Sequence, residues 1–89
     1  MSARREVEPI AALDDESSDR IKRQFGERVR QLRTDAGLSQ EKLAELAGIH
    51  RNYVGDVERG RRNLALVNLV RISVALGADP AELVRGLRG

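Results

Sequence analysis

The sequence predicts an all-α protein, folded as a compact five-helix bundle. Aromatic residues make up only 2% of the 89 residues, whereas strands are usually enriched in them. Leu, Ala, Arg and Glu are common, and these residues favour helices. Apolar residues also recur every three or four positions in successive segments, which is the period of an amphipathic helix. A chain of this length suits one domain with a modest core.

The first 16 residues differ from the rest in charge and periodicity. They contain Pro9, show no sustained apolar period, and end in the acidic run 14–16. Two arginines against five acidic residues give this segment a formal charge of −3, which leaves +5 for the rest of a chain whose total is +2. We expect residues 1–16 to form a flexible acidic tail and residues 17–89 to form the domain. A basic domain is compatible with a polyanionic partner.

The first helix is predicted from Ser18, which can cap it, to Gly37, which can end it in a left-handed turn. Gly26 lies inside this helix and can let a neighbouring helix approach closely. Five apolar residues spaced by three or four positions define the buried stripe: Ile21, Phe25, Val29, Leu32 and Ala36.

Four shorter helices follow. Ser39 is placed to cap the second, which Gly48 ends, and the third runs over about 50–59 with Val54 and Val57 facing inward. The fourth runs over about 66–76, and the fifth begins at Asp79-Pro80, a favourable helix start. Their expected inward or apolar residues are Leu66, Leu69 and Val70 in the fourth helix, with Ile72 or Ser73, and Leu83, Val84 and Leu87 in the fifth.

The segment 39–60 (SQEKLAELAGIHRNYVGDVERG) carries the functional signal. Two short helices meet at 47–49, where small residues permit close approach and Gly48 permits a sharp turn. This pattern predicts a helix-turn-helix, in which the second helix enters the major groove of DNA. Its first residues, Arg51, Asn52 and Tyr53, can all hydrogen-bond to base edges or phosphates.

Three separated motifs occur in the order expected for one family. Residues 32–44 (LRTDAGLSQEKLA) and 53–60 (YVGDVERG) resemble the two ends of the Cro and phage-repressor type of helix-turn-helix, also called the xenobiotic response element family. Residues 69–80 (LVRISVALGADP) resemble its fourth helix and exit. The resemblance covers about residues 22–87 and implies a lambda-repressor-like DNA-binding domain. Within the family, the segment 51–64 is similar to the controller proteins of restriction–modification systems.

The resemblance implies roles for individual residues. It implies that Arg51 reads guanine, that Asn52 reads a base edge and that Tyr53 contacts a base or a phosphate. Asp56, on the same helix, departs from the family pattern: its charge can repel a phosphate, or it can read a base by accepting a hydrogen bond from a cytosine amino group. Those expected to bind backbone phosphates are Ser39, Gln40, Arg59, Arg61, Arg62 and Asn63. Arg33 and Glu58 correspond to a structural ion pair between the first and third helices. His50 stands at the cap of the third helix, where Ser, Thr or Asp is usual, so we expect weaker capping there.

The leading interpretation is a sequence-specific transcriptional regulator that binds a pseudo-palindromic operator on double-stranded DNA as a homodimer. Val84 and Leu87 either pack in the core or form the dimer interface. The alternative is an antitoxin-like protein-interaction module that uses the domain mainly to bind a protein partner. Regulation as activator or repressor is left open.

Other classes of function lack support in the sequence. There is no cysteine and only one histidine, His50, so we expect no metal site, no cofactor and no catalytic constellation. No apolar run is long enough to span a bilayer, and no signal-peptide pattern opens the chain. We therefore expect a cytoplasmic, nucleoid-associated protein of bacterial or phage type that is not an enzyme, does not enter membranes and has no small-molecule ligand.

Overall fold

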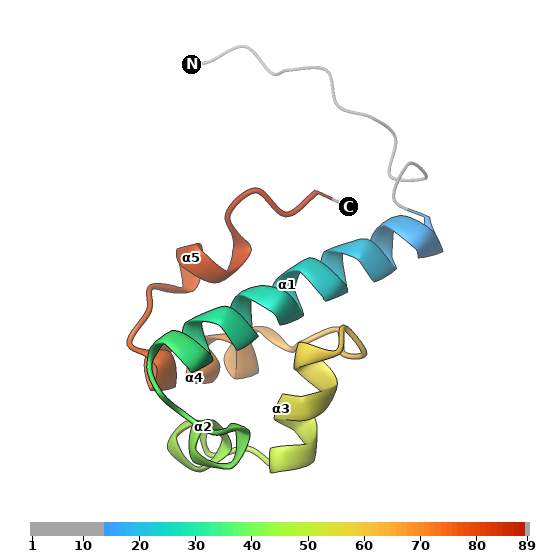
Figure 1. Cartoon of the computed structure of the whole chain (residues 1–89). Helices are drawn as coiled ribbons and strands as arrows, with labels where there is room; N and C mark the ends of the chain where they lie inside the picture. Colours follow the sequence, from blue (N-terminus) through green and yellow to red (C-terminus); the bar gives the residue numbers. More distant parts are fainter. Residues whose placement is uncertain (1–13, 89) are drawn as a thin grey trace, which may run out of the picture.

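The computed structural model describes residues 14–88, and the greater part of the expected tail, residues 1–13, lies outside the described residues. The described part of the chain is helical and holds no strand, which confirms the all-α prediction. Its five helices surround one core, with the long α1 crossing the molecule and the shorter ones packed below and above it (Figure 1). The helices are α1 (Asp15–Asp35), α2 (Gln40–Ala47), α3 (Arg51–Glu58), α4 (Leu66–Leu76) and α5 (Pro80–Val84).

Helix α1 begins earlier than the sequence analysis predicted. Asp14 caps it: its Oδ1 accepts a hydrogen bond from the backbone N–H of Ser17 at 2.9 Å, so Ser18 is not the cap. This bond lowers the pKa of the Asp14 carboxyl. Asp15 and Glu16 occupy the first turn, where the helix dipole favours negative charge. The acidic run assigned to the tail therefore starts the helix.

The core lies where α1 crosses the helix-turn-helix and α4. Helix α1 supplies Phe25 and Val29 from its predicted stripe, whereas Ile21 and Leu32 are half-buried and Ala36 is exposed. The other buried hydrophobic residues are Leu43, Ala44, Ala47, Val54, Val57, Ile72 and Leu83.

Helix α4 is rotated relative to the prediction. Ile72 and Ser73 are buried and Leu69 is half-buried, but Leu66 is 75% exposed and Val70 is 39% exposed. The prediction was wrong for these last two residues because α4 is apolar on nearly every side, with Arg71 as its one charged residue. A helix of this kind has no polar face to fix its rotation, so packing against its neighbours decides it.

Helix α5 is a short element that closes the bundle against α1 and α4. Asp79 caps it by accepting from the N–H of Ala81 at 2.8 Å. Leu83 is fully buried, and Arg28 of α1 donates to its carbonyl at 3.1 Å. Leu87 lies beyond the end of the helix that was expected to carry it.

None of the five helices between residues 14 and 88 has both the length and the hydropathy that a membrane-spanning helix needs.

Candidate nucleic-acid interface

Helices α2 and α3 form the predicted helix-turn-helix. Ala44 and Ala47 are buried at the contact, where their small side chains allow the helices to approach. Gly48 ends α2 with φ 70°, a left-handed conformation that strains other residues. The N–H of Ile49 then donates to the carbonyl of Ala44 at 3.0 Å, which closes the turn.

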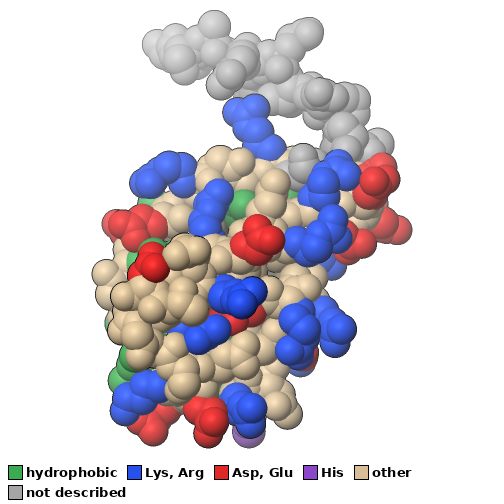
Figure 2. All heavy atoms as spheres, in the orientation of Figure 1, with side chains coloured by type: hydrophobic (Ala, Val, Ile, Leu, Met, Phe, Trp, Pro, Cys, Tyr) green, Lys and Arg blue, Asp and Glu red, His purple; other side chains and the backbone are tan. Residues whose placement is uncertain are grey.

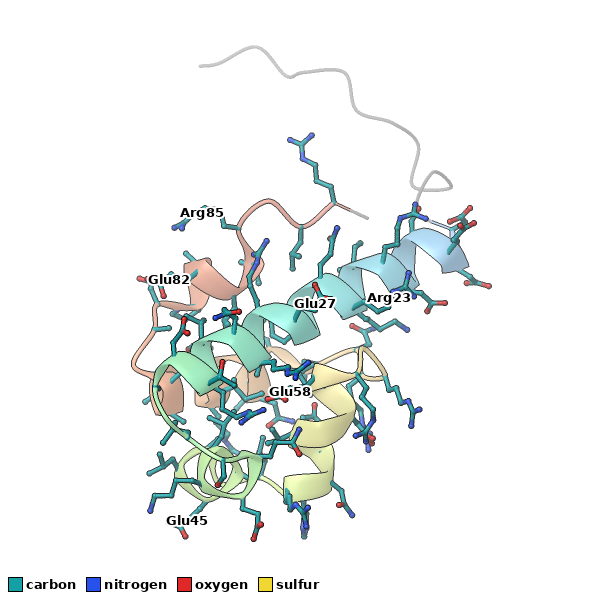
Figure 3. All side chains as sticks on the ribbon, in the orientation of Figure 1. Arg23, Glu27, Glu45, Glu58, Glu82 and Arg85 are labelled. Atoms are coloured by element: carbon teal, nitrogen blue, oxygen red, sulfur yellow. The ribbon has the colours of Figure 1, made fainter. Side chains whose placement is uncertain are left out.

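The predicted structural ion pair is present and buried. Arg33 donates from Nε to Oε2 of Glu58 at 2.6 Å and from Nη2 to Oε1 at 3.0 Å. Only 12% of the Arg33 side chain and 4% of the Glu58 side chain are exposed. The hydrogen bond to Glu58 raises the pKa of Arg33. Figure 3 shows Glu58 between α1 and α3, whereas Glu45 lies at the outer rim of α2.

Glu58 also anchors the start of α2. Nε2 of Gln40 donates to Oε1 of Glu58 at 3.0 Å, and Nη1 of Arg33 donates to the carbonyl of Leu38 at 2.8 Å. Ser39 caps α2 as predicted, its hydroxyl accepting from the N–H of Lys42 at 2.9 Å. One carboxylate therefore holds the ends of α1 and α3 and the beginning of α2 in a fixed relation.

Helix α3 presents its first turn to solvent. Val54 and Val57, with at most 1% of their surface exposed, hold one side of the helix against the core. Arg51 and Asn52 lie on the outer side and are exposed. His50 precedes them in the cap position, and its side chain makes no capping hydrogen bond.

Tyr53 and Asp56 are less accessible than the other predicted base readers. Tyr53 is half-buried and accepts a hydrogen bond at its hydroxyl from Nδ2 of Asn68 at 3.3 Å. Asp56 accepts from Arg59 at 2.8 Å and from Arg62 at 3.4 Å, one bond to each carboxylate oxygen. The bond from Arg59 is the main cause that lowers the pKa of Asp56.

The loop after α3 supplies most of the predicted phosphate contacts. Its exposed polar and basic residues are Arg59, Arg61, Arg62 and Asn63. Figure 2 shows Lys and Arg side chains gathered along this edge of the molecule, beside α3. The exposed first turn and the basic loop therefore lie at the two ends of α3, an arrangement that suits a polyanion with a groove.

Two features of α4 escaped the sequence analysis. One is Asn68, whose contact with Tyr53 spans 15 residues of sequence. The other is an exposed apolar stripe, a term used here for Leu66, Val67, Val70 and Val74. At 3.6 residues per turn these four positions fall within about 100° of the helix circumference. The uniformly apolar composition of α4 was the signal that could have revealed it, because so small a domain cannot bury every side of such a helix.

Comparison with known proteins identifies the family. A family model described as a helix-turn-helix domain matches residues 24–85. The chain belongs to this helix-turn-helix family. The resemblance to the Cro and phage-repressor type drawn from the sequence is thereby confirmed, as is its similarity to controller proteins.

Relatives of this helix-turn-helix protein include two named control proteins. It is 46% identical over 68 residues to control protein C.BamHI of Bacillus amyloliquefaciens, covering 75% of this chain and 84% of that protein. It is 44% identical over 64 residues to control protein C.SmaI of Serratia marcescens, covering 72% and 76%. These names are those of regulatory proteins rather than enzymes.

A solved structure agrees in fold. The restriction–modification controller protein C.AhdI of Aeromonas hydrophila superimposes with a TM-score of 0.68 and is 56% identical. The match covers 68% of this chain and 92% of that one.

Proposed function

We propose that this helix-turn-helix protein is a sequence-specific transcription regulator, and that α3 enters the major groove of double-stranded DNA. The observation that carries this proposal is the exposed first turn of α3, bearing Arg51 and Asn52, on a helix fixed from behind by Val54, Val57 and Glu58. A rigid support matters because base readout requires donors held in place before DNA arrives. Similarity to controller proteins supports the same role.

The proposed contacts follow from the chemistry of each side chain. Arg51 can donate two parallel hydrogen bonds to N7 and O6 of guanine, and Asn52 can reach a neighbouring base edge. Ser39 and Gln40 stand at the start of α2, where backbone N–H groups favour a phosphate. Gln40 has a second amide hydrogen beyond the one given to Glu58. Arg59, Arg61, Arg62 and Asn63 would follow the sugar–phosphate backbone.

We also propose that the protein acts as a homodimer, with the apolar stripe of α4 as the main contact. One short recognition helix reads few base pairs, and a two-fold operator doubles them. The stripe carries no charge, so a second copy related by a two-fold axis meets no repulsion there. Val84 of α5 is 42% exposed and offers less apolar surface. Leu87 is half-buried and packed against the core, so we assign it mainly to the fold.

The proposal extends to where and how the protein acts. A bacterial cytoplasmic regulator at the nucleoid, working without catalysis or cofactor, fits its bacterial regulatory relatives. The genes it controls would then be found by searching for its operator.

Selection of randomised duplexes tests base reading. At near-physiological salt the protein should enrich a two-fold-symmetric motif with guanines at matching positions. Arg51→Ala should relax the preference at one position in each half-site and cost about 1–3 kcal/mol of binding free energy. Arg85→Ala removes the same charge at the far end of the molecule from α3 (Figure 3) and should leave the motif unchanged. An intact guanine preference in Arg51→Ala would refute the assignment.

Sedimentation equilibrium tests the dimer surface. Val74→Glu should weaken the dimer at least tenfold, because each copy then places a carboxylate in the apolar stripe, and dimerisation through the stripe would remove that charge from water. Val84→Glu is the matched control, an exposed valine on α5, and should leave the dimer intact. The reverse result would move the interface to α5.

A further inference from the structure

A chain of contacts links α4 to the DNA-facing side of α3. Asn68 donates to the hydroxyl of Tyr53 at 3.3 Å. The guanidinium carbon of Arg62 lies 4.9 Å from the centre of the Tyr53 ring, within the range of a cation–π contact. Arg62 also donates to Asp56 at 3.4 Å. Asn68, Tyr53, Arg62 and Asp56 thus form one continuous network, called the Tyr53 network below.

The network restrains a side chain that would otherwise be mobile. Arg62 belongs to the irregular segment 61–65 between α3 and α4, and 48% of its side chain is exposed. An arginine in such a loop loses much rotamer freedom when it binds a phosphate. Restraint by the Tyr53 ring and by Asp56 imposes that loss before DNA binds, so the contact forms with less entropic cost.

The restraint leaves Arg62 able to bind DNA. A guanidinium has five N–H donors, and the structure shows one of them directed at Asp56. The remaining donors can reach a phosphate oxygen at the groove edge. Asp56 also places a negative charge between Arg59 and Arg62, which reduces the repulsion between these two cations.

We propose that Asn68 is a positioning residue for DNA binding: it fixes the Tyr53 hydroxyl, and the Tyr53 ring in turn holds Arg62 against the phosphate backbone. In the same network Asp56 holds the arginines and does not read a base. This inference rests on the proposed DNA-binding function and adds to it a residue of α4, a helix that lies outside the helix-turn-helix itself.

The operator selected by the wild-type protein is the probe for a double-mutant cycle. Asn68→Ala and Tyr53→Phe should each weaken binding to it about three- to tenfold, the scale of one lost hydrogen bond. The double variant should bind as weakly as Tyr53→Phe alone, because Asn68 acts through the hydroxyl that this change removes. A loss from Asn68→Ala that persists in the Tyr53→Phe background would overturn the proposal.

Salt dependence gives a second measurement that a purely structural role would not alter. The slope here is that of the logarithm of the DNA association constant against the logarithm of the salt concentration. Arg62→Ala should make this slope shallower by about one unit, because one phosphate contact is lost. Asn68→Ala should make it shallower by less than that, and the base preferences should stay as in the wild type. An unchanged slope in Asn68→Ala would count against the proposal. Gln24→Ala, which removes an exposed amide on α1, is the control and should change neither the salt slope nor the base preferences.

The selection of randomised duplexes also tests the role of Asp56. Asp56→Ala should leave the preferred base at every position unchanged, whereas altered preference at one position would show that Asp56 reads a base.

Thermal unfolding of each variant separates loss of fold from loss of positioning. If the wild-type protein enriched no motif, the proposed function itself would fail. If it enriched one and Asn68→Ala bound it normally, only this inference would fail.

Discussion

Glu58→Ala is expected to lower the free energy of unfolding by about 3–5 kcal/mol, the usual cost of removing one partner from a buried ion pair. The change leaves the Arg33 guanidinium, 12% exposed, without its carboxylate. It also removes the acceptor for Gln40 at the start of α2. A small domain has little stability to lose, so much of the protein should be unfolded at physiological temperature. Urea denaturation followed by helical circular dichroism measures the change.

Glu45→Ala is the matched control for this experiment. Glu45 pairs with Lys42 at 2.8 Å, but 69% of the Glu45 side chain and 53% of the Lys42 side chain are exposed. Exposed ion pairs contribute little to stability, because water screens the charges and side-chain entropy opposes the pairing. We therefore expect no measurable change in the free energy of unfolding. The double change Arg33→Met with Glu58→Met should cost less than the two single changes added together, because no charge is left buried. Equal effects from Glu58→Ala and Glu45→Ala would contradict this account.

Gly26→Ala is expected to lower the free energy of unfolding by about 3 kcal/mol, the upper part of the usual range for overpacking. A Cβ at this position would lie 2.8 Å from the carbonyl oxygen of Glu58 and closer still to that of Val57. Both are backbone atoms, so no side-chain rotation can relieve the clash, and α1 and α3 must move apart. The clash outweighs the gain in helix propensity, about 1 kcal/mol for alanine over glycine. Thermal and urea unfolding both report the loss.

Gly55→Ala makes the same substitution in another buried helical position. A Cβ there would lie 3.3 Å from Nη1 of Arg59, the far end of a flexible side chain that can move. This variant should be as stable as the wild type or more stable by up to about 1 kcal/mol. If Gly26→Ala also proved neutral, the close approach of α1 to the end of α3 would not be essential to the fold.

Local sequence signals were sufficient for most of the secondary structure. Ser39 and Asp79 cap the helices predicted to follow them, and Gly48 makes the turn of the helix-turn-helix. The predicted start of α1 was wrong, because Asp14 and Ser18 are both acceptable caps by residue type. The structure uses the earlier residue, which adds a turn to the helix and places its acidic residues at the favourable end of the helix dipole.

In the candidate site, too, local sequence signals predicted some features, and tertiary contacts decided the others. The exposed turn with Arg51 and Asn52 follows from the motif, and the three-residue spacing of Val54 and Val57 placed both of them inside. No local signal indicated the bond between Asn68 and Tyr53 or the engagement of Asp56 by two arginines. Those contacts depend on how α3, the following loop and α4 come together.

The sequence by itself determined that residues 14–88 form five helices, where four of them begin, and which two short helices make the helix-turn-helix. These properties are local, because helix period, caps and turn glycines act over a few residues. Only the tertiary structure decided that Leu66 and Val70 face solvent, that Gly26 meets the α3 backbone, and which polar side chains pair. The rotation and approach of a helix are set by the summed packing of all its neighbours, and an apolar helix such as α4 has several rotations that its own sequence cannot distinguish.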